Sequence, residues 1–213
     1  MRTLARLSLL SLCIAVLQAC AQPALKGEVS EEFASQDLYP VRNSGFAEAF
    51  ARRDANLASF HSVDIRPLGV SDIDIPSTAV AGTLRRDWQM TAERQTALQQ
   101  AWADAMNQAF AGYQRAADGP AVLRIDSRLI RIAPGRPTST TIGGDLQPMG
   151  SSRDVIEVQA EFRLYDAGNE KLLAVIRDSR TLTSVQMSRT APATMKLLFG
   201  SWASLLHTRV SGK

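Results

Sequence analysis

Cys20 is the residue whose surroundings point most directly to covalent chemistry. It ends the stretch Leu17-Gln18-Ala19-Cys20, with a leucine three positions before it and a small residue directly before it. This pattern resembles a bacterial lipobox, in which the cysteine thiol receives a diacylglyceryl group and the chain is then cut between Ala19 and Cys20. An ordinary secretory signal is the alternative, because Ala19-Cys20-Ala21 also satisfies the small-x-small cleavage rule.

The residues before Cys20 have the parts of an export signal. Arg2 and Arg6 make a positive start, and the apolar stretch 7–17 is too short to span a bilayer. Lipoproteins with Asp after the cysteine are retained in the inner membrane, whereas this chain has Ala21 there, which favours the outer membrane. We therefore expect a signal peptide over residues 1–19, a lipidated cysteine with a tether or arm over 20–56, and an α+β lipoprotein domain over 57–213.

Cys20 has no second thiol to pair with in the mature chain. Cys13 is the other cysteine and lies within the signal, so no disulfide can form inside the mature protein. With two histidines and no spare cysteine, a zinc site would depend mostly on carboxylates, which is unusual for zinc. We expect no metal and no cofactor, and we expect stability to come from packing.

Two acids and two histidines are the remaining candidates for catalysis. Glu157 and Glu161 share the wet face of a predicted strand, and paired carboxylates can perform acid–base chemistry. Nearby arginines favour charge pairing between strands instead. A hydrolase would need a serine or threonine of 138–152 as nucleophile and His61 or His207 as base.

The composition indicates one domain and no polyanionic partner. The chain has 213 residues, and removal of the signal leaves enough of it to bury a proper core. The signal holds two of the 24 basic residues and none of the 21 acidic ones, so the net charge of the mature chain falls from +3 to +1. No basic run interleaved with aromatic residues indicates nucleic-acid binding. Gly143-Gly144 is not followed by Lys-Ser or Lys-Thr, so no nucleotide loop is predicted.

Hydrophobic periodicity predicts four strands and two helices. The strands are expected at 60–70, 121–133, 155–165 and 172–182, and the helices at 91–113 and 191–210, with Pro192 in the first turn of the last helix. Thr91 is expected to cap the first helix, whose aromatic stripe through Trp102 is expected in the core and not along a lipid groove. Gly200 costs the last helix about 1 kcal/mol relative to Ala, so we expect a close backbone approach there.

Local signals refine these elements. Phe46 and Phe50 are four residues apart, which permits a short helix, although an arm that packs both rings on the domain is the favoured interpretation. The apolar phase changes near Leu129, which predicts a bulge or a strand buried on both faces. In the hairpin turn 166–170, Gly168 or Asn169 is expected to take a positive φ.

Together these elements predict a two-layer α+β domain. A mainly antiparallel sheet of about four strands, with two amphipathic helices packed on one face in the order β-α-β-β-β-α, buries every apolar stripe. The first strand, the first helix and the second strand form a right-handed crossover if the two strands lie parallel.

An ordered set of short motifs along the chain resembles one known family. The set comprises the lipobox at Cys20, Ser44-Gly45-Phe46, Val63-Asp64-Ile65-Arg66-Pro67, Trp88 before the Thr91-capped helix, Leu123-Arg124-Ile125, Val155–Asp166, and Phe199-x-x-Trp202-Ala203. In this the chain is similar to the bacterial lipoproteins of domain of unknown function 3313. The resemblance implies an envelope lipoprotein with no assigned reaction and no catalytic residues to transfer. The fold is also similar, more loosely, to periplasmic accessory domains of envelope transport systems.

These observations lead us to expect a non-enzymatic lipoprotein, held to the outer membrane and facing the periplasm, that acts as an accessory or binding module. Its expected partners are the membrane, through the lipid anchor, and an envelope protein or a lipid-derived ligand. The alternatives are an envelope hydrolase and a purely structural role. If the chain is not lipidated, we expect it in the periplasm or outside the cell.

The anchor predicts that cells fed a fatty-acid analogue will label the wild-type protein, because acylation follows the lipobox cysteine. Cys20→Ser should remove the label completely, as measured by in-gel detection after fractionation. Unlabelled wild-type protein in the soluble periplasm would refute the anchor.

Overall fold

The computed structural model describes residues 28–76, 89–134 and 155–212. Cys20 and the signal, Trp88, and the Ser/Thr-rich segment 138–152 with Gly143-Gly144 lie outside the described residues. None of the described helices is long and apolar enough to cross a membrane.

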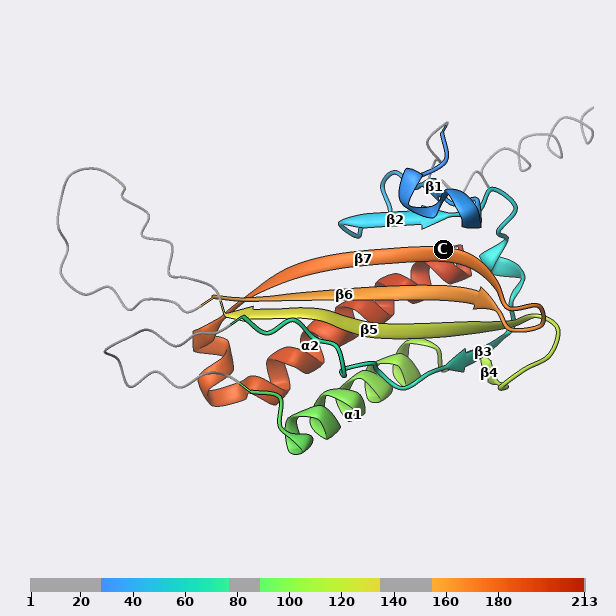
Figure 1. The fold of residues 1–213 in the computed structure, drawn as a ribbon. Coiled ribbons are helices and arrows are strands. Elements are labelled where there is room, and N and C mark those ends of the chain that lie inside the picture. The colour runs from blue at the N-terminus through green and yellow to red at the C-terminus, as the bar shows by residue number, and fades with distance from the viewer. Residues whose placement is uncertain (1–27, 77–88, 135–154, 213) are drawn as a thin grey trace, which may run out of the picture.

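One sheet of seven strands forms the first layer, and two helices form the second (Figure 1). The strand order is β1-β2-β7-β6-β5-β3-β4. The strands are β1 (Tyr39–Pro40), β2 (Glu48–Ala51), β3 (Ser62–Ile65), β4 (Gln114–Arg115), β5 (Val122–Pro134), β6 (Val155–Asp166) and β7 (Lys171–Thr183). The helices are α1 (Ala92–Ala109) and α2 (Ser184–Ser211). Of two 3-10 turns, η1 (Glu31–Gln36) precedes β1, and η2 (Leu57–Ser59) lies between β2 and β3.

The two-layer α+β class is confirmed, but the expectation of about four strands is wrong. β3, β5, β6 and β7 are the predicted strands, but the full order β1-β2-β3-α1-β4-β5-β6-β7-α2 does not match the predicted order exactly. β1, β2 and β4 extend the sheet at both edges. Strands of two to four residues are too short to show an alternating pattern, and they form because neighbouring strands supply their partners: β7 for β2, β2 for β1 and β3 for β4.

Pairing within the sheet follows the predicted crossover. β3 is parallel to β5, with α1 between them in the chain, and β5, β6 and β7 are antiparallel hairpin neighbours. The register of β5 against β6 shifts between Leu129 and Arg131, so the predicted bulge is present. Thr91 accepts a hydrogen bond from the amide of Arg94 through its side chain, and the predicted cap of α1 is confirmed.

Four aromatic rings join both helices to the middle of the sheet. Trp102 on α1 stacks on Phe162 of β6 with ring centroids 5.5 Å apart, and Trp202 on α2 meets the same ring edge-on at 5.7 Å. Phe199 contacts both tryptophans. The stripe through Trp102 therefore lies in the core, as predicted, and both helices cover the face of the sheet that Phe162 presents.

The arm before β3 is tied to the domain as two strands and not as a helix. Phe46 packs in the main core, whereas Phe50, on β2, packs with Phe33 and Leu38 over Val175 on the other face of β7. The expected short helix is wrong, because Phe46 and Phe50 serve opposite faces of the sheet. The expectation that both rings pack on the domain is confirmed.

The last helix begins at Ser184, well before the predicted start at residue 191. In the sequence the apolar stripe runs from Met195 onward, so the preceding residues give no periodic signal, and Pro192 lies inside the helix. The first buried stripe residues after it are Met195, Leu198 and Phe199.

The hairpin turn between β6 and β7 also differs from its prediction. The residue with positive φ is Glu170, at 58°, and not Gly168 or Asn169. The Asp166 side chain accepts the amide of Gly168, and the Asn169 side chain accepts that of Lys171. These two side-chain bonds shape the turn locally and move the left-handed residue to its end.

Gly200 and Gly45 make a matched pair for a stability test. A methyl group added at Gly200 would meet no described atom within 4 Å outside the helix, so the expected close approach there is wrong. At Gly45, φ is +79° and an added methyl would lie 3.2 Å from the Leu205 side chain.

Gly200→Ala should therefore stabilise the protein by about 0.5–1 kcal/mol, because Ala loses less backbone entropy in a helix. Gly45→Ala should destabilise it by about 1–3 kcal/mol, through backbone strain and the contact with Leu205. Urea unfolding followed by circular dichroism measures both. A destabilised Gly200→Ala variant would contradict the open surroundings of that glycine.

Candidate binding groove

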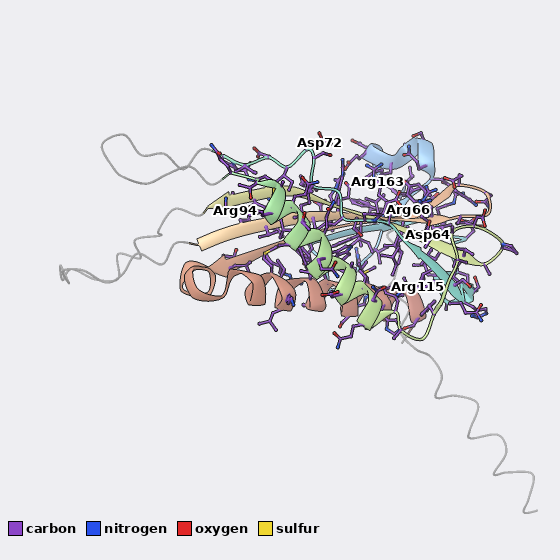
Figure 2. All side chains as sticks on the ribbon, turned by 90° about the horizontal axis from the view of Figure 1, so that it is seen from below. Asp64, Arg66, Asp72, Arg94, Arg115 and Arg163 are labelled. Atoms are coloured by element: carbon purple, nitrogen blue, oxygen red, sulfur yellow. The ribbon has the colours of Figure 1, made fainter. Side chains whose placement is uncertain are left out.

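An open groove of about 620 Å³ lies between α1 and the outer part of the sheet. β3 and the following residues 66–68 form one wall, α1 forms the other, and residues 115–117 close one end. Its volume is in the range of small-molecule sites in proteins. Figure 2, seen from below, shows α1 across the sheet with Arg94 and Arg115 toward its opposite ends, and Asp64 and Arg66 nearer to Arg115.

The groove exists because β4 ends early. β4 pairs with Ser62 and Val63 only, and α1 packs by Trp102 over β6 and not over β3. Val63 accepts a hydrogen bond from the amide of Ala116 through its carbonyl oxygen, so Val63 faces the β4 edge. Ile65 is two residues further and faces the same edge, past the end of β4. Its backbone groups therefore point toward the groove.

The wall after β3 is held firmly to its neighbours. Gly69 donates its amide to the carbonyl of Ser127 on β5 at 2.8 Å and accepts the amide of Leu129 at 3.0 Å. Gln99 on α1 donates its side-chain amide to the carbonyl of Leu68 at 3.0 Å. The groove is thus bounded by a helix and a strand edge joined by hydrogen bonds at one end.

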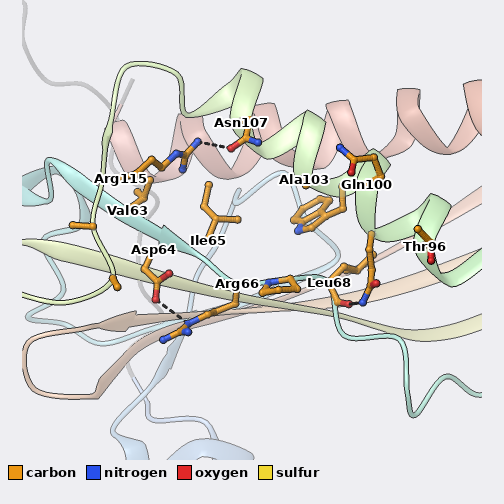
Figure 3. A pocket seen from close by; sticks show the side chains of 15 residues that line it. Val63, Asp64, Ile65, Arg66, Leu68, Thr96, Gln100, Ala103, Asn107 and Arg115 are labelled. Atoms are coloured by element: carbon orange, nitrogen blue, oxygen red, sulfur yellow. Dashed lines mark hydrogen bonds and ion pairs between the residues drawn. The ribbon is translucent and has the colours of Figure 1, made fainter.

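The charges of the groove do not cancel. Asp64 and Arg66 form an ion pair at 2.8 Å, whereas Arg115 donates to the neutral side chain of Asn107 at 3.0 Å (Figure 3). Among the described residues, no carboxylate lies within ion-pair distance of Arg115. Burial lowers the pKa of Arg115 from its usual value, although the residue as a whole is exposed.

The lining of the groove is mixed, with eight apolar and seven polar or charged residues, and Val63 and Leu68 are only 1% and 2% exposed. Figure 3 shows Val63 and Ile65 between the Arg115–Asn107 hydrogen bond and the Asp64–Arg66 pair. Leu68 and Trp102 also line the groove. Trp102 is only 1% exposed, and its Nε1 finds no hydrogen-bond partner in the part of the chain that the structure describes. A buried indole N–H usually has a partner, so this donor is unusual.

Sequence reasoning missed this groove, although it singled out one of its walls. Val63-Asp64-Ile65-Arg66-Pro67 appears among the motifs of the family resemblance, without a role. Arg115 and Asn107 carried no motif. The parallel pairing of β3 with β4, which places Arg115 beside Val63, has no local signal in so short a strand.

The predicted catalytic histidines are not brought to a common site. His61 lies just before β3 at the surface, and His207 on α2 packs edge-on against Phe110 and Tyr113 at 5.3 and 5.9 Å. Within residues 28–76, 89–134 and 155–212, neither ring hydrogen bonds to a hydroxyl or a carboxylate. The candidate nucleophiles of 138–152 lie outside the described residues.

Glu161 forms the cross-strand charge pairing that its position predicts. It is 1% exposed, and three arginines contact it at 2.8–2.9 Å: Arg128 on β5, Arg163 on β6 and Arg177 on β7. Burial would raise the pKa of Glu161, but hydrogen bonds from Arg177 and Arg163 and the charge of Arg128 hold it below its usual value. Glu161 is therefore ionised at neutral pH, which does not suit a general acid.

Glu157 is bound differently. It accepts hydrogen bonds from the side chains of Gln159 and Ser179, both at 2.8 Å, and these bonds lower its pKa. The expected charge pairing is therefore seen at Glu161, whereas Glu157 is held by neutral donors. Neither carboxylate shares a proton with the other.

The fold and the groove define a two-layer α+β domain with an open, partly apolar cleft beside a strand edge. The model of a family described as a protein of unknown function (DUF3313) matches residues 30–206. The chain belongs to this family, as the ordered motifs indicate.

Solved structures show only distant likeness. The PelC dodecamer from Paraburkholderia phytofirmans is 12% identical, with a TM-score of 0.39 over 75% of this chain and 96% of that chain. A DUF330 protein from Xanthomonas campestris is 14% identical, with a TM-score of 0.38 over 75% and 90%. A minor lipoprotein from Acinetobacter baumannii is 10% identical, with a TM-score of 0.30 over 71% and 93%. No curated protein matches significantly. Likeness at this level carries no conclusion about function.

The buried Glu161 predicts a pH-dependent loss of stability. Because its folded pKa is below the unfolded value of 4.5, its contribution is complete above pH 4.5 and is lost as the pH falls below that value. Glu161→Gln should cost about 2–3 kcal/mol at pH 7, since it leaves three arginines without their shared anion. The difference from wild type should shrink as the pH falls below 4.5, as measured by urea unfolding.

Glu31→Gln is the control for this series, because Glu31 is exposed. It should change stability by less than about 0.5 kcal/mol. A Glu161→Gln deficit that is independent of pH would show that the carboxylate is not the stabilising species.

Proposed function

We propose that this protein is a binding module of the bacterial cell envelope, tethered to the outer membrane through Cys20 and facing the periplasm. The observation that carries the binding role is the open groove between β3 and α1, in which Arg115 is bonded to the neutral side chain of Asn107. The location rests on the signal and lipobox pattern of residues 1–20. The family described by the matching model supplies no reaction.

The form of the groove supports binding. Its walls belong to a helix and a strand of the core, so a ligand would meet prearranged side chains at a low ordering cost. Its lining mixes eight apolar residues with seven polar or charged ones, among them Arg115, Asn107 and Gln100, so it offers both apolar surface and hydrogen-bonding groups. Arg115 keeps a charge that the protein leaves without a carboxylate counterion among the described residues.

The described acids and histidines give catalysis less support. Glu161 is held by three arginines, Glu157 accepts neutral donors, and His207 packs on two aromatic rings. A structural role would need no open groove. The binding role therefore accounts for more of the molecule than either alternative.

Site-specific crosslinking in native membranes tests this function. A photo-reactive amino acid at Gln100, which lines the groove, should form a discrete adduct with a lipid or protein. The same residue at Ser204, exposed on α2 outside the groove, should not. Mass spectrometry of the purified protein identifies the adduct.

Ala103→Trp provides the matched loss-of-binding variant, because Ala103 lines the groove and the larger side chain would fill it. Its folding is checked by circular dichroism. Adducts at Gln100 that persist with Trp at position 103, or that match those at Ser204, would refute binding in the groove.

A further inference from the structure

We propose that the edge of β7 over residues 179–183 binds an extended segment of a partner protein, which adds a strand to the sheet. The segment carries an apolar side chain opposite Leu182 and an acidic side chain opposite Arg180. β6 and β5 separate this edge from the groove at β3, so the inference goes beyond the proposed function and does not depend on it.

The edge is open because β2 is much shorter than β7. β2 pairs with β7 from Ala174 to Arg177, whereas β6 pairs with β7 as far as Thr183. Figure 1 shows β2 beside only a part of β7, whose end nearest to the start of α2 extends past it. Ala47, the residue before β2, donates its amide to the side chain of Asp178 at 2.9 Å and not to the backbone of β7. The arm therefore leaves the edge of β7 at this residue.

The backbone groups of alternate β7 residues point toward this open side. Ala49 accepts the amide of Val41 and so faces β1, which means that its neighbour Glu48 faces β7. Arg177, the register partner of Glu48, therefore faces β2. Because N–H and C=O groups change sides at each residue, every second residue after Arg177, as far as Thr183, turns its backbone groups to the same side.

Two of these residues, Ser179 and Thr181, are exposed to solvent. Within the described residues, neither has a backbone hydrogen-bond partner on this side of β7. A strand edge with free N–H and C=O groups is a template for pairing with another extended chain. In such strand addition, main-chain hydrogen bonds supply the affinity and alternate side chains supply the specificity.

The side chains on the helix-covered face of β7 set the sequence preference. Leu182 is partly buried against the main core, so an apolar side chain opposite it would extend that core. Asp178 is buried and accepts three hydrogen bonds, whereas Arg180, bonded to Asp178 through Nε, has 43% of its side chain exposed. Arg180 therefore presents its charge at this edge, and cross-strand pairing favours a carboxylate opposite it.

A second copy of this chain fits the edge less well than a peptide segment. Two copies of the edge could pair over residues 179–183 only, which is far less than the ~1,200 Å² that a stable protein–protein interface buries. A peptide segment needs no more than the edge itself, because strand addition relies on main-chain hydrogen bonds.

Amide hydrogen exchange measured by NMR on the mature chain carrying Cys20→Ser tests whether the edge is open. In the chain alone, the amides of Ser179 and Thr181 should exchange at least tenfold faster than those of Asp178 and Arg180, which face β6. Saturation with the peptide acetyl-Thr-Val-Thr-Glu-Thr-amide should slow the exchange of Ser179 and Thr181 at least tenfold, because the added strand bonds to both.

Variants of this peptide separate the main chain from the side chains. Bound antiparallel, it places its valine opposite Leu182 and its glutamate opposite Arg180. Lysine in place of the glutamate should weaken binding about threefold to tenfold in an NMR titration. N-methylation of the three threonine amides, which face β7, should abolish binding. N-methylation of the valine and glutamate amides, which face away from β7, should change the affinity less than threefold.

Three protein variants test the same edge. Thr181→Pro removes the amide at its centre and should abolish binding, whereas Thr181→Val keeps the amide and should bind within twofold of wild type. Circular dichroism checks that both variants are folded. Arg180→Gln should bring the affinities of the glutamate and lysine peptides within twofold of each other.

The proposal has distinct failures. Slow exchange of Ser179 and Thr181 in the chain alone would show that the edge is already filled, by a second copy if the protection disappears on dilution and by another segment of this chain if it persists. Equal binding of the two N-methylated peptides, or no binding of any peptide at millimolar concentration, would refute strand addition. Equal affinity for the glutamate and lysine peptides would refute the acidic partner. The crosslinks at Gln100 report on the groove alone, so their failure would overturn the proposed function and not this edge.

Discussion

The buried carboxylate of Asp178 is the interaction on which the arrangement of arm, sheet and helix layer depends. It lies on β7, on the face covered by the helices, and is 5% exposed. It accepts the indole N–H of Trp202 at 2.7 Å, the amide of Ala47 at 2.9 Å and the Nε of Arg180 at 2.6 Å. A buried charge is stable only when it is fully bonded, so these donors must converge. One side chain thereby fixes α2 and the arm against β7.

The opposite face of the sheet is organised by a second buried carboxylate, Glu161. Its three arginines come from three neighbouring strands, and Arg177 also binds Glu32 of η1. The arm thus contributes a charge to this face as well as the small apolar cluster of Phe33 and Leu38 over Val175. Buried carboxylates thus tie neighbouring elements together on both faces of the sheet.

The groove is a consequence of how the sheet is covered. The aromatic contacts of Trp102 hold α1 over the centre of the sheet, and β4 ends after two residues, so part of the β3 edge has no strand paired to it among the described residues. The same tryptophan belongs to the core and lines the groove. A change at Trp102 would therefore alter both the groove wall and the packing of α1.

The sequence by itself determined the long elements, the class of the fold and the predicted route to the envelope. Apolar and polar residues alternate along Val155–Asp166, and the apolar stripe through Trp102 repeats over several helical turns. Each pattern is long enough to predict its element reliably. The bulge near Leu129 and the cap at Thr91 were also predictable, because each has a local cause. Even the pairing of Glu161 followed from strand alternation and neighbouring arginines.

Only the tertiary structure decided the short strands and the groove. β2 and β4 are strands because β7 and β3 offer them partners. The four residues of β2 and the two of β4 are too few to predict that pairing. Gly200 has open space around it and Gly45 does not, although the residue type is the same at both positions. Arg115 becomes a candidate ligand-binding residue because it stands beside Val63 and away from any described carboxylate. These properties depend on contacts between segments that are far apart in the sequence, and local sequence patterns do not predict such contacts.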